Sequence, residues 1–270
     1  MITYRATLDV PAHTLTVVTR WITAHRRARD IRPWQRAATA RTQALLVLRW
    51  FKDVTRVDIR AIDAGISVAT AYRYLHEAID IIAERAPDLH DVLATAKVQA
   101  WPFLALDAGP DRPAARTTQP DRRRVVVLRQ APPPGANIQV LCDPTGYPVW
   151  VSPASPGSTH DITAARRFVL PALYRAAAAG IPTLTDKGYQ GAGIGIRHPR
   201  RLTAAAHVDD LARDRILISL RATAERGNTL LKHSWRALRL TTLDPSRTTE
   251  ITAAALVLLH LQRGTARSAW

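Results

Sequence analysis

The sequence predicts an α/β fold, with a mixed β-sheet flanked by helices, preceded by an all-helical region. Residues 1 to about 95 carry apolar residues at helical spacing and hardly any strand-like pattern, whereas the pattern changes after Lys97. From there the order is strand, hairpin, helix, strand and helix, which is typical of a sheet with helices packed on it. We therefore predict a helical domain over residues 1–95 and an α/β domain over residues 96–270.

The helical region is predicted from apolar residues that recur at helical spacing. The short turn 65–67 separates its last two helices, and Ser67 would cap the helix that follows. The apolar residues Ile66, Ala71 and Leu75 would then face the core. The predicted helices span residues 15–27, 42–52, 57–64 and 68–84.

The last two of these helices have the layout of a helix-turn-helix DNA-binding unit. The second helix would present Thr70, Tyr72 and Arg73 to a DNA major groove. An ordinary helical hairpin is the alternative, because the pattern alone does not distinguish the two structures.

The α/β region is predicted from apolar runs between turn signals. Residues 143–146 place Pro and Gly where a tight hairpin turn needs them. The segment 156–161 (PGSTHD) opens a helix, and Gly180 ends it. The predicted strands are 101–107, 137–142, 147–152 and 182–185, and the predicted helices are 162–179 and roughly 204–238.

The charge of the chain indicates a polyanionic partner, and nucleic acid is the leading candidate. The formal net charge is +16 and the isoelectric point is near 11.2. Arginine supplies most of the positive charge and suits bidentate phosphate contacts, although a GC-rich genome also favours arginine. The run Arg122–Arg124 is either a phosphate-facing loop or a solvated, disordered one.

The remaining composition suggests a soluble protein of the cytoplasm. Cys142 is the only cysteine, which excludes an intramolecular disulfide and a cysteine-built zinc site. No apolar run approaches the roughly 20 residues of a membrane span, and the N-terminus lacks the layout of a signal peptide.

Three carboxylates stand in distinctive frames: Asp107 in LALDAG, Asp186 in TDKGYQG and Glu225 in AERGNTLLK. If Asp107 and Asp186 end neighbouring strands, both lie at one edge of the sheet while Glu225 approaches from a helix. Such a cluster is costly unless cations neutralise it, and oxygen ligands without thiolates suit two Mg²⁺ or Mn²⁺ ions. Two ions could activate a water or 3′-hydroxyl and stabilise the leaving oxygen in an in-line displacement at phosphorus.

The helix that carries Glu225 is predicted to present a polar and basic face. Glu225 shares this face with Asn228, Thr229, Lys232 and Arg236. A carboxylate for the metal, followed two turns later by a cation for the adjacent phosphate, suits a DNA site. A solvated helix face is the alternative for an isolated Glu and Lys pair.

Asp161 is a competitor for the role of second catalytic carboxylate. Ser158, Thr159 or Asp161 would cap the helix that begins at Ile162, so we favour capping over catalysis for Asp161. Ser158, His160 and Asp161 are also too close in sequence for a hydrolase triad, whose members converge from separate segments.

The sequence resembles the DDE-type transposases of bacterial insertion sequences, in the group related to eukaryotic Harbinger elements. The likeness lies in Leu106 with Asp107, the PGSTHD segment, the DKGYQG segment, and Glu225 with Lys232, and it covers residues from about 45 to 260. It implies a ribonuclease-H-like catalytic domain, with Asp107, Asp186 and Glu225 as metal-binding catalytic residues. Lys232 would lie near the DNA end. A helical N-terminal module would recognise the terminal repeats of the element.

The resemblance implies a nuclease that cuts double-stranded DNA at terminal inverted repeats and joins the freed 3′-hydroxyl to target DNA. A homodimer would hold the two ends together, in the bacterial cytoplasm near the nucleoid. The family usually follows its first aspartate with Gly-Thr, whereas Ala108 and Gly109 stand here. The alternative is a catalytically inactive or repurposed transposase-derived DNA-binding protein. A hydrolase of another phosphate ester is a third reading that gives the N-terminal domain no role.

Overall fold

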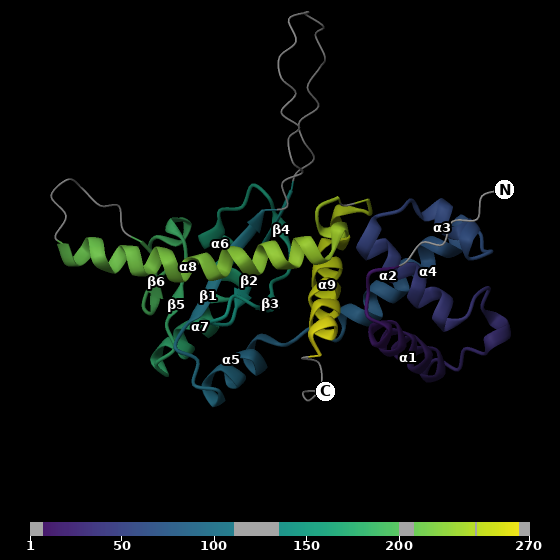
Figure 1. Ribbon diagram of the computed structural model, residues 1–270, viewed down its shortest axis with the longest axis horizontal. Helices are drawn as coiled ribbons and strands as arrows, with labels where there is room; N and C mark the ends of the chain where they lie inside the picture. Colours follow the sequence, from purple (N-terminus) through teal and green to yellow (C-terminus); the bar gives the residue numbers. More distant parts are fainter. Residues whose placement is uncertain (1–7, 111–134, 200–207, 241, 265–270) are drawn as a thin grey trace, which may run out of the picture.

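The computed structural model describes residues 8–110, 135–199, 208–240 and 242–264; the arginine run 122–124 lies outside them. Four N-terminal helices lie at one end of an elongated molecule and the sheet lies towards the other (Figure 1). A helix near the C-terminus, α9 (Thr248–Arg263), stands between these two parts. The N-terminal helices are α1 (Ala12–Ala28), α2 (Ala40–Asp53), α3 (Val57–Asp63) and α4 (Val68–Ala83).

These four helices confirm the ones expected from the apolar spacing, and the predicted cap of α4 is present. The Ser67 Oγ atom accepts a hydrogen bond from the Thr70 amide at 3.2 Å. The sequence pattern did not predict the next helix, α5 (Leu89–Val98), which contains the proposed boundary near residue 95. Its cap is Asp88, whose carboxylate accepts a hydrogen bond from the His90 amide at 2.7 Å.

Helices α3 and α4 form a pair in which α4 turns one side to the core. Ala71 and Leu75 are fully buried and Ile66 packs against them, as predicted. Tyr72 and Arg73 are exposed on the other side of α4. The exposure needed for DNA contact is therefore present, while the helix-turn-helix role itself stays a prediction.

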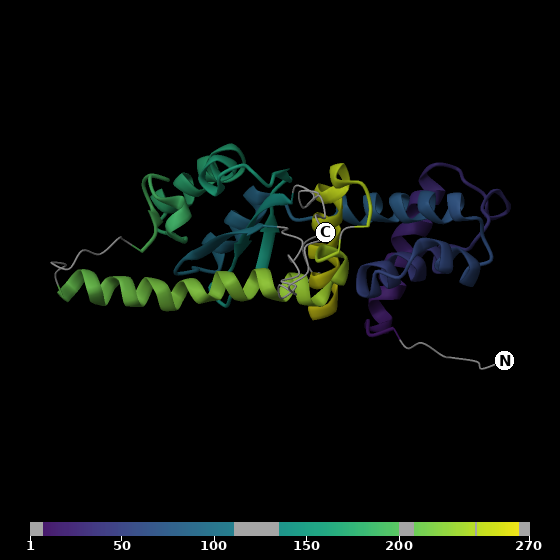
Figure 2. The ribbon, with the colours of Figure 1, turned by 90° about the horizontal axis from the view of Figure 1, so that it is seen from above.

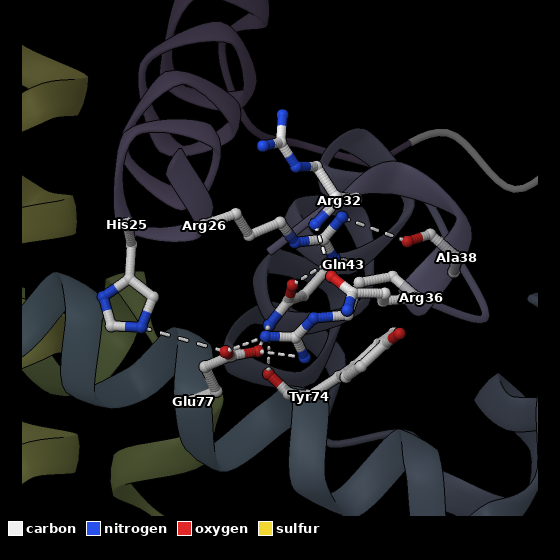
Figure 3. A network of polar contacts seen from close by, with 9 residues as sticks. His25, Arg26, Arg32, Arg36, Ala38, Gln43, Tyr74 and Glu77 are labelled. Atoms are coloured by element: carbon white, nitrogen blue, oxygen red, sulfur yellow. Dashed lines mark hydrogen bonds and ion pairs between the residues drawn. The ribbon is translucent and has the colours of Figure 1, made fainter. Parts of the chain in front are cut away.

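A network of polar side chains fixes α4 against the helices before it (Figure 3). The Glu77 carboxylate accepts hydrogen bonds from Arg36 at 2.5 and 3.1 Å and from Gln43 at 2.9 Å. Gln43 in turn accepts a hydrogen bond from Arg26 at 2.8 Å. Burial opposes ionisation of Glu77, but these donors and the charges of Arg36 and His25 outweigh it and lower the pKa of Glu77.

The sheet is mixed, with order β3-β2-β1-β5-β6, and β4 pairs with the far end of β2. Strands β1, β2 and β3 are antiparallel, whereas β1, β5 and β6 are parallel. A mixed sheet flanked by helices is consistent with the ribonuclease-H-like fold that was predicted. The strands are β1 (Leu104–Pro110), β2 (Ala136–Cys142), β3 (Pro148–Val151), β4 (Ser155–Pro156), β5 (Thr183–Leu184) and β6 (Ile196–Arg197).

Strands β2 and β3 form the predicted hairpin. The Asp143 carboxylate accepts hydrogen bonds from the amides of Thr145 at 2.8 Å and Tyr147 at 2.9 Å, so it shapes the turn as an Asx residue does. Gly146 has a φ of +83°, a left-handed conformation that glycine adopts without strain.

The single helix expected over residues 162–179 is two helices, which corrects the prediction. Helix α6 (Asp161–Phe168) ends at Val169, where φ is −132°, and α7 (Leu170–Ala178) begins directly afterwards. Pro171 lies in the first turn of α7, where its missing N–H is tolerated, whereas inside one continuous helix it would remove a hydrogen bond. Gly180, with a φ of +90°, follows the end of α7 as predicted.

The long helix that carries Glu225 is α8 (Val208–Ser234), four residues shorter at its C-terminal end than expected. The chain leaves the helix because Trp235 is fully buried and meets Phe51 of α2 edge to face, with ring centroids 5.9 Å apart. A separate 3₁₀ turn, η3 (Arg236–Leu238), follows. The sequence pattern did not predict α9.

The sheet separates two apolar clusters, because successive strand residues face opposite sides. Ala105 of β1 packs in a cluster with α8, α9 and the N-terminal helices, while Leu104 and Leu106 pack with α5, α6 and α7. Figure 2 shows α8 along one face of the sheet and α6 and α7 on the other. Within the ranges that the structure describes, no helix is both long and apolar enough to cross a membrane.

Candidate active site

Asp107 lies within β1, two residues after Ala105, and Asp186 follows β5, two residues after Leu184. Ala105 and Leu184 form the last pair in the parallel register of β1 and β5. The Asp186 carboxylate accepts a hydrogen bond from the Gly188 amide at 2.8 Å, in the short 3₁₀ turn η2 (Lys187–Tyr189). The prediction that Asp107 ends the strand 101–107 is wrong, because β1 continues to Pro110 through its antiparallel pairing with β2.

Two glycines bring α8 close to the hairpin. A methyl group at Gly227 would lie 2.3 Å from the Cys142 Sγ atom, and one at Gly146 would lie 2.5 Å from the Thr223 carbonyl oxygen. Ordinary heavy-atom contacts are about 3.5–4.0 Å, so neither position has room for a side chain. Burial raises the pKa of the Cys142 thiol, so this cysteine packs as a small apolar residue.

Asn228 joins α8 directly to Asp107. Its amide Nδ2 donates a hydrogen bond to the Asp107 Oδ2 atom at 2.7 Å, and the residue is only 9% exposed. A methyl group at Gly109 would lie 2.9 Å from the Asn228 Oδ1 atom and 3.7 Å from the Lys232 Nζ atom. The Lys232 ammonium therefore lies beside β1, two residues along the strand from Asp107.

Glu225 is exposed one helical turn before Asn228, on the same flank of α8 as Lys232. Thr229 is exposed as well. Arg236 is also exposed but lies beyond the end of α8, in η3, so it does not belong to the face that the sequence predicted. The physical reason is the burial of the preceding Trp235, which ends the helix.

Asp107, Asp186 and Glu225, the predicted metal ligands, do not form a metal-binding group among the described residues. In the described part of the chain, no three His, Cys, Asp or Glu side chains form a group that could hold a metal ion. Asp107, Asp186 and Glu225 all belong to that part. The donor chemistry fits Mg²⁺ or Mn²⁺, because these side chains offer only oxygen ligands.

Asp161 does not cap α6, which corrects the prediction. The cap position is His160, without a side-chain hydrogen bond, and Asp161 is the first residue of the helix. The Asp161 Oδ1 atom instead accepts a hydrogen bond from the Asn137 amide Nδ2 at 2.6 Å. The Oδ2 atom of Asp161 faces Gly188, where an added methyl group would lie 3.3 Å from it and 3.0 Å from the Asp186 Oδ1 atom.

A buried tyrosine lies among the aspartates. The Tyr189 hydroxyl donates a hydrogen bond to the Gln139 Oε1 atom at 2.6 Å. Burial is the first cause that raises the pKa of Tyr189 well above its ordinary value, and the negative charges of Asp161, Asp107 and Asp186 add to it. The phenol therefore stays protonated and remains a donor.

Sequence reasoning gave no role to Asn137, Gln139 or Tyr189, and it missed the partner of Asn228. The signal for Asn137 and Gln139 was available, since two amides at period two in an otherwise apolar strand must share one face and find partners there. Asn228 was assigned to the polar helix face without a partner. Its bond to Asp107 joins residues 121 positions apart, which no local pattern predicts.

The residues of α4 that were predicted to contact DNA are far in sequence from these carboxylates. Thr70 is half-buried and bonded through its hydroxyl to the Ser67 hydroxyl at 2.9 Å, so its side chain is engaged in the cap. Tyr72 and Arg73 are exposed, and the Arg73 guanidinium lies 5.9 Å from the centre of the Tyr74 ring. Of the three, Tyr72 and Arg73 are the better placed for a groove.

Comparison with known proteins gives one family match. No curated protein and no solved structure matches the chain. The family model described as DDE superfamily endonuclease matches residues 128–260, which include Asp161, Asp186, Glu225 and Lys232 but not Asp107. Such endonucleases are metal-dependent nucleases that act on DNA. The match over residues 128–260 supports a DDE-type transposase family for this chain.

Proposed function

We propose that this protein is a DNA transposase that cleaves DNA at the ends of an insertion sequence and joins the 3′-hydroxyl to target DNA. The observation that supports the proposal is the hydrogen bond from Asn228 of α8 to Asp107 of β1, the strand that pairs in parallel with the one preceding Asp186. The endonuclease match over residues 128–260 supports the same reading.

Asp107, Asp186 and Glu225 would hold the divalent ions, Mg²⁺ or Mn²⁺, which would supply charge neutralisation at the reacting phosphate. The protein's own groups prepare this site. Asn228 orients Asp107 by its 2.7 Å hydrogen bond, and the Gly188 amide orients Asp186. Lys232 would hold the phosphate of the DNA end beside Gly109. These groups fix the position of substrate and carboxylates before reaction, which is how phosphoryl-transfer sites gain most of their rate.

The N-terminal helices would recognise the terminal inverted repeats through Tyr72 and Arg73, with Thr70 supporting the start of α4. Arg236, exposed at the end of α8, would contact the DNA backbone outside the catalytic site. Two copies would form a homodimer, because two DNA ends must be held together for joining. Such a protein would work in the bacterial cytoplasm, associated with the nucleoid.

A second function follows from the sequence around Asp107. Ala108 and Gly109 stand where the family usually has Gly-Thr after its first aspartate. A transposase-derived DNA-binding protein without catalysis would carry such a departure. The two functions differ in their response to metal, since binding alone needs no divalent ion.

The test is cleavage of DNA that carries candidate terminal repeats, with Mg²⁺ or Mn²⁺ and with chelator. Asp186→Asn and Glu225→Gln should abolish metal-dependent cleavage while DNA binding stays intact, because each removes one carboxylate charge and changes little else. The matched control is Asp244→Asn, which alters a turn carboxylate bonded to the Ser246 amide. Equal loss of cleavage and binding in a folded Asp186→Asn protein would contradict the assignment. Binding without cleavage in the unmodified protein would favour the second function.

A further inference from the structure

Three hydrogen bonds link the turn that carries Asp186 to Asp161 through the interior of the protein. Tyr189, in that turn, donates to Gln139; Gln139 donates through Nε2 to the Asn137 Oδ1 atom at 2.9 Å; and Asn137 donates to Asp161. Tyr189 and Gln139 are fully buried and Asn137 is 4% exposed. Asp161 also lies near Gly188, the residue before Tyr189, since a methyl group added to Gly188 would be 3.3 Å from the Asp161 Oδ2 atom.

We propose that Asp161 is a positioning residue for Asp186, held in place by this buried relay of Tyr189, Gln139 and Asn137. The proposal rests on the proposed nuclease function, in which Asp186 holds metal. Asp161 acts through Gly188, whose amide holds the Asp186 carboxylate at 2.8 Å.

Every hydrogen bond of the relay donates towards Asp161, so the last partner must be an acceptor, as a carboxylate is. Each amide uses its oxygen to accept and its nitrogen to donate, so turning either amide over would place two donors or two acceptors together. The Asn137 nitrogen also donates to the Thr159 carbonyl oxygen at 3.0 Å, which fixes its orientation a second time. Hydrogen bonds in a chain that ends on a carboxylate strengthen one another. Removing one partner should therefore cost more free energy than the loss of a single isolated bond.

The geometry also separates this role from the two alternatives for Asp161. A helix cap would bond to amides of the first turn of α6, and no side-chain cap bond is present at that helix start. A metal ligand would act through its charge, whereas a positioning residue acts through its shape and its hydrogen bond. Asp161→Asn distinguishes these, since it keeps an oxygen for Asn137 and loses the charge.

The experiment measures cleavage and local hydrogen exchange in Asp161→Asn, Asp161→Ala, Tyr189→Phe and the double variant Asp161→Ala/Tyr189→Phe. Exchange is followed by mass spectrometry on peptides that cover residues 184–190, in the full chain with and without Mn²⁺. Asp244→Ala is the matched control, because it removes a turn carboxylate bonded to the Ser246 amide, outside the relay.

Asp161→Ala and Tyr189→Phe should each lower the cleavage rate by about 10- to 100-fold, as a displaced catalytic group does. Both should raise exchange in residues 184–190, and the double variant should be no worse than the more severe single one, because one relay is broken in each case. Asp161→Asn should restore most of the rate, to within roughly fivefold of the unmodified protein. The control should change exchange only near its own turn.

The proposal is overturned if Asp161→Asn loses as much cleavage as Asp186→Asn, which would make its charge the active property. It is also overturned if residues 184–190 exchange normally in both Asp161→Ala and Tyr189→Phe. If the unmodified protein never cleaves DNA, the nuclease function fails while the exchange measurement still decides whether the relay holds the Asp186 turn.

Discussion

Replacing Gly227 with alanine tests whether the close approach of α8 to the hairpin builds the site. Alanine is the better helix former by about 1 kcal/mol in a helix interior, so a freely exposed α8 would be stabilised. In this position the new methyl group would lie 2.3 Å from the Cys142 Sγ atom and 2.9 Å from the Gly146 carbonyl oxygen. Ordinary contacts between heavy atoms are about 3.5 Å or longer, so α8 or the hairpin would have to move by more than about 1 Å to relieve the first contact alone.

Overpacking of this kind costs about 1–3 kcal/mol, and the rigid turn at Gly146 places the expected cost at the upper end. Subtracting the helical gain leaves a net loss of about 1–2 kcal/mol in the free energy of unfolding. The midpoint of thermal unfolding, followed by circular dichroism, should fall by about 2–4 °C for each kcal/mol in a chain of this size. Metal-dependent cleavage at 20 °C or below should fall further, because the shift of α8 would lengthen the bond from Asn228 to Asp107.

Cys142→Ala supplies the compensating change, since it removes the sulfur that the new methyl group meets. The double variant Cys142→Ala/Gly227→Ala should be more stable than the sum of the two single changes predicts. A Gly227→Ala protein that is as stable as the unmodified chain, or more stable, would refute the argument that this contact positions α8.

Three further predictions follow from the charges and hydrogen bonds of the described residues. Asn228→Ala should destabilise the fold by about 1–3 kcal/mol in urea unfolding, because it leaves the half-buried Asp107 carboxylate without its amide donor; an unchanged midpoint would argue against that bond. Glu77→Gln should destabilise the protein by about 1.5–3 kcal/mol near neutral pH. Because folding lowers the pKa of Glu77, its carboxylate stabilises the fold fully above the ordinary pKa of 4.5, and this stabilisation is lost as the pH falls through the lower pKa of the folded state. The variant and the unmodified protein should therefore converge in stability in acid. A difference in stability that does not change with pH would contradict this argument. Lys232→Ala should reduce the slope of DNA affinity against salt by about one unit if Lys232 contacts a phosphate, and leave it unchanged otherwise.

The sequence predicted the elements whose signals are local. The four N-terminal helices, the hairpin around Asp143 and the strand before Asp186 follow from apolar period and turn residues, and the structure has them. The break at Val169 was missed because Pro171 was read within one continuous helix, although a proline is better tolerated in a first turn. Helix α8 ends early because Trp235 packs on a helix far away in the sequence.

The candidate site residues Asp107, Asp186 and Glu225 came from their sequence frames and stay a prediction. The end of the first strand was misplaced because its pairing with β2, which carries it to Pro110, is a long-range property. The role of Asp161 was misread because a polar residue at a helix start is usually a cap, and its real partner, Asn137, lies 24 positions earlier in the chain. Long-range hydrogen bonds of this kind leave no periodic trace.

Helix α9 has a consequence for how the protein is made. Its buried residues, including Ile251, Ala255 and Leu258, belong to the same apolar cluster as Ile79 and Ile82 of α4. Synthesis proceeds from the N-terminus, so α4 leaves the ribosome with this surface uncovered while more than half of the chain is still to come. The N-terminal helices therefore reach their final packing only after α9 has been synthesised, and a chain interrupted before α9 would present apolar surface to chaperones and proteases.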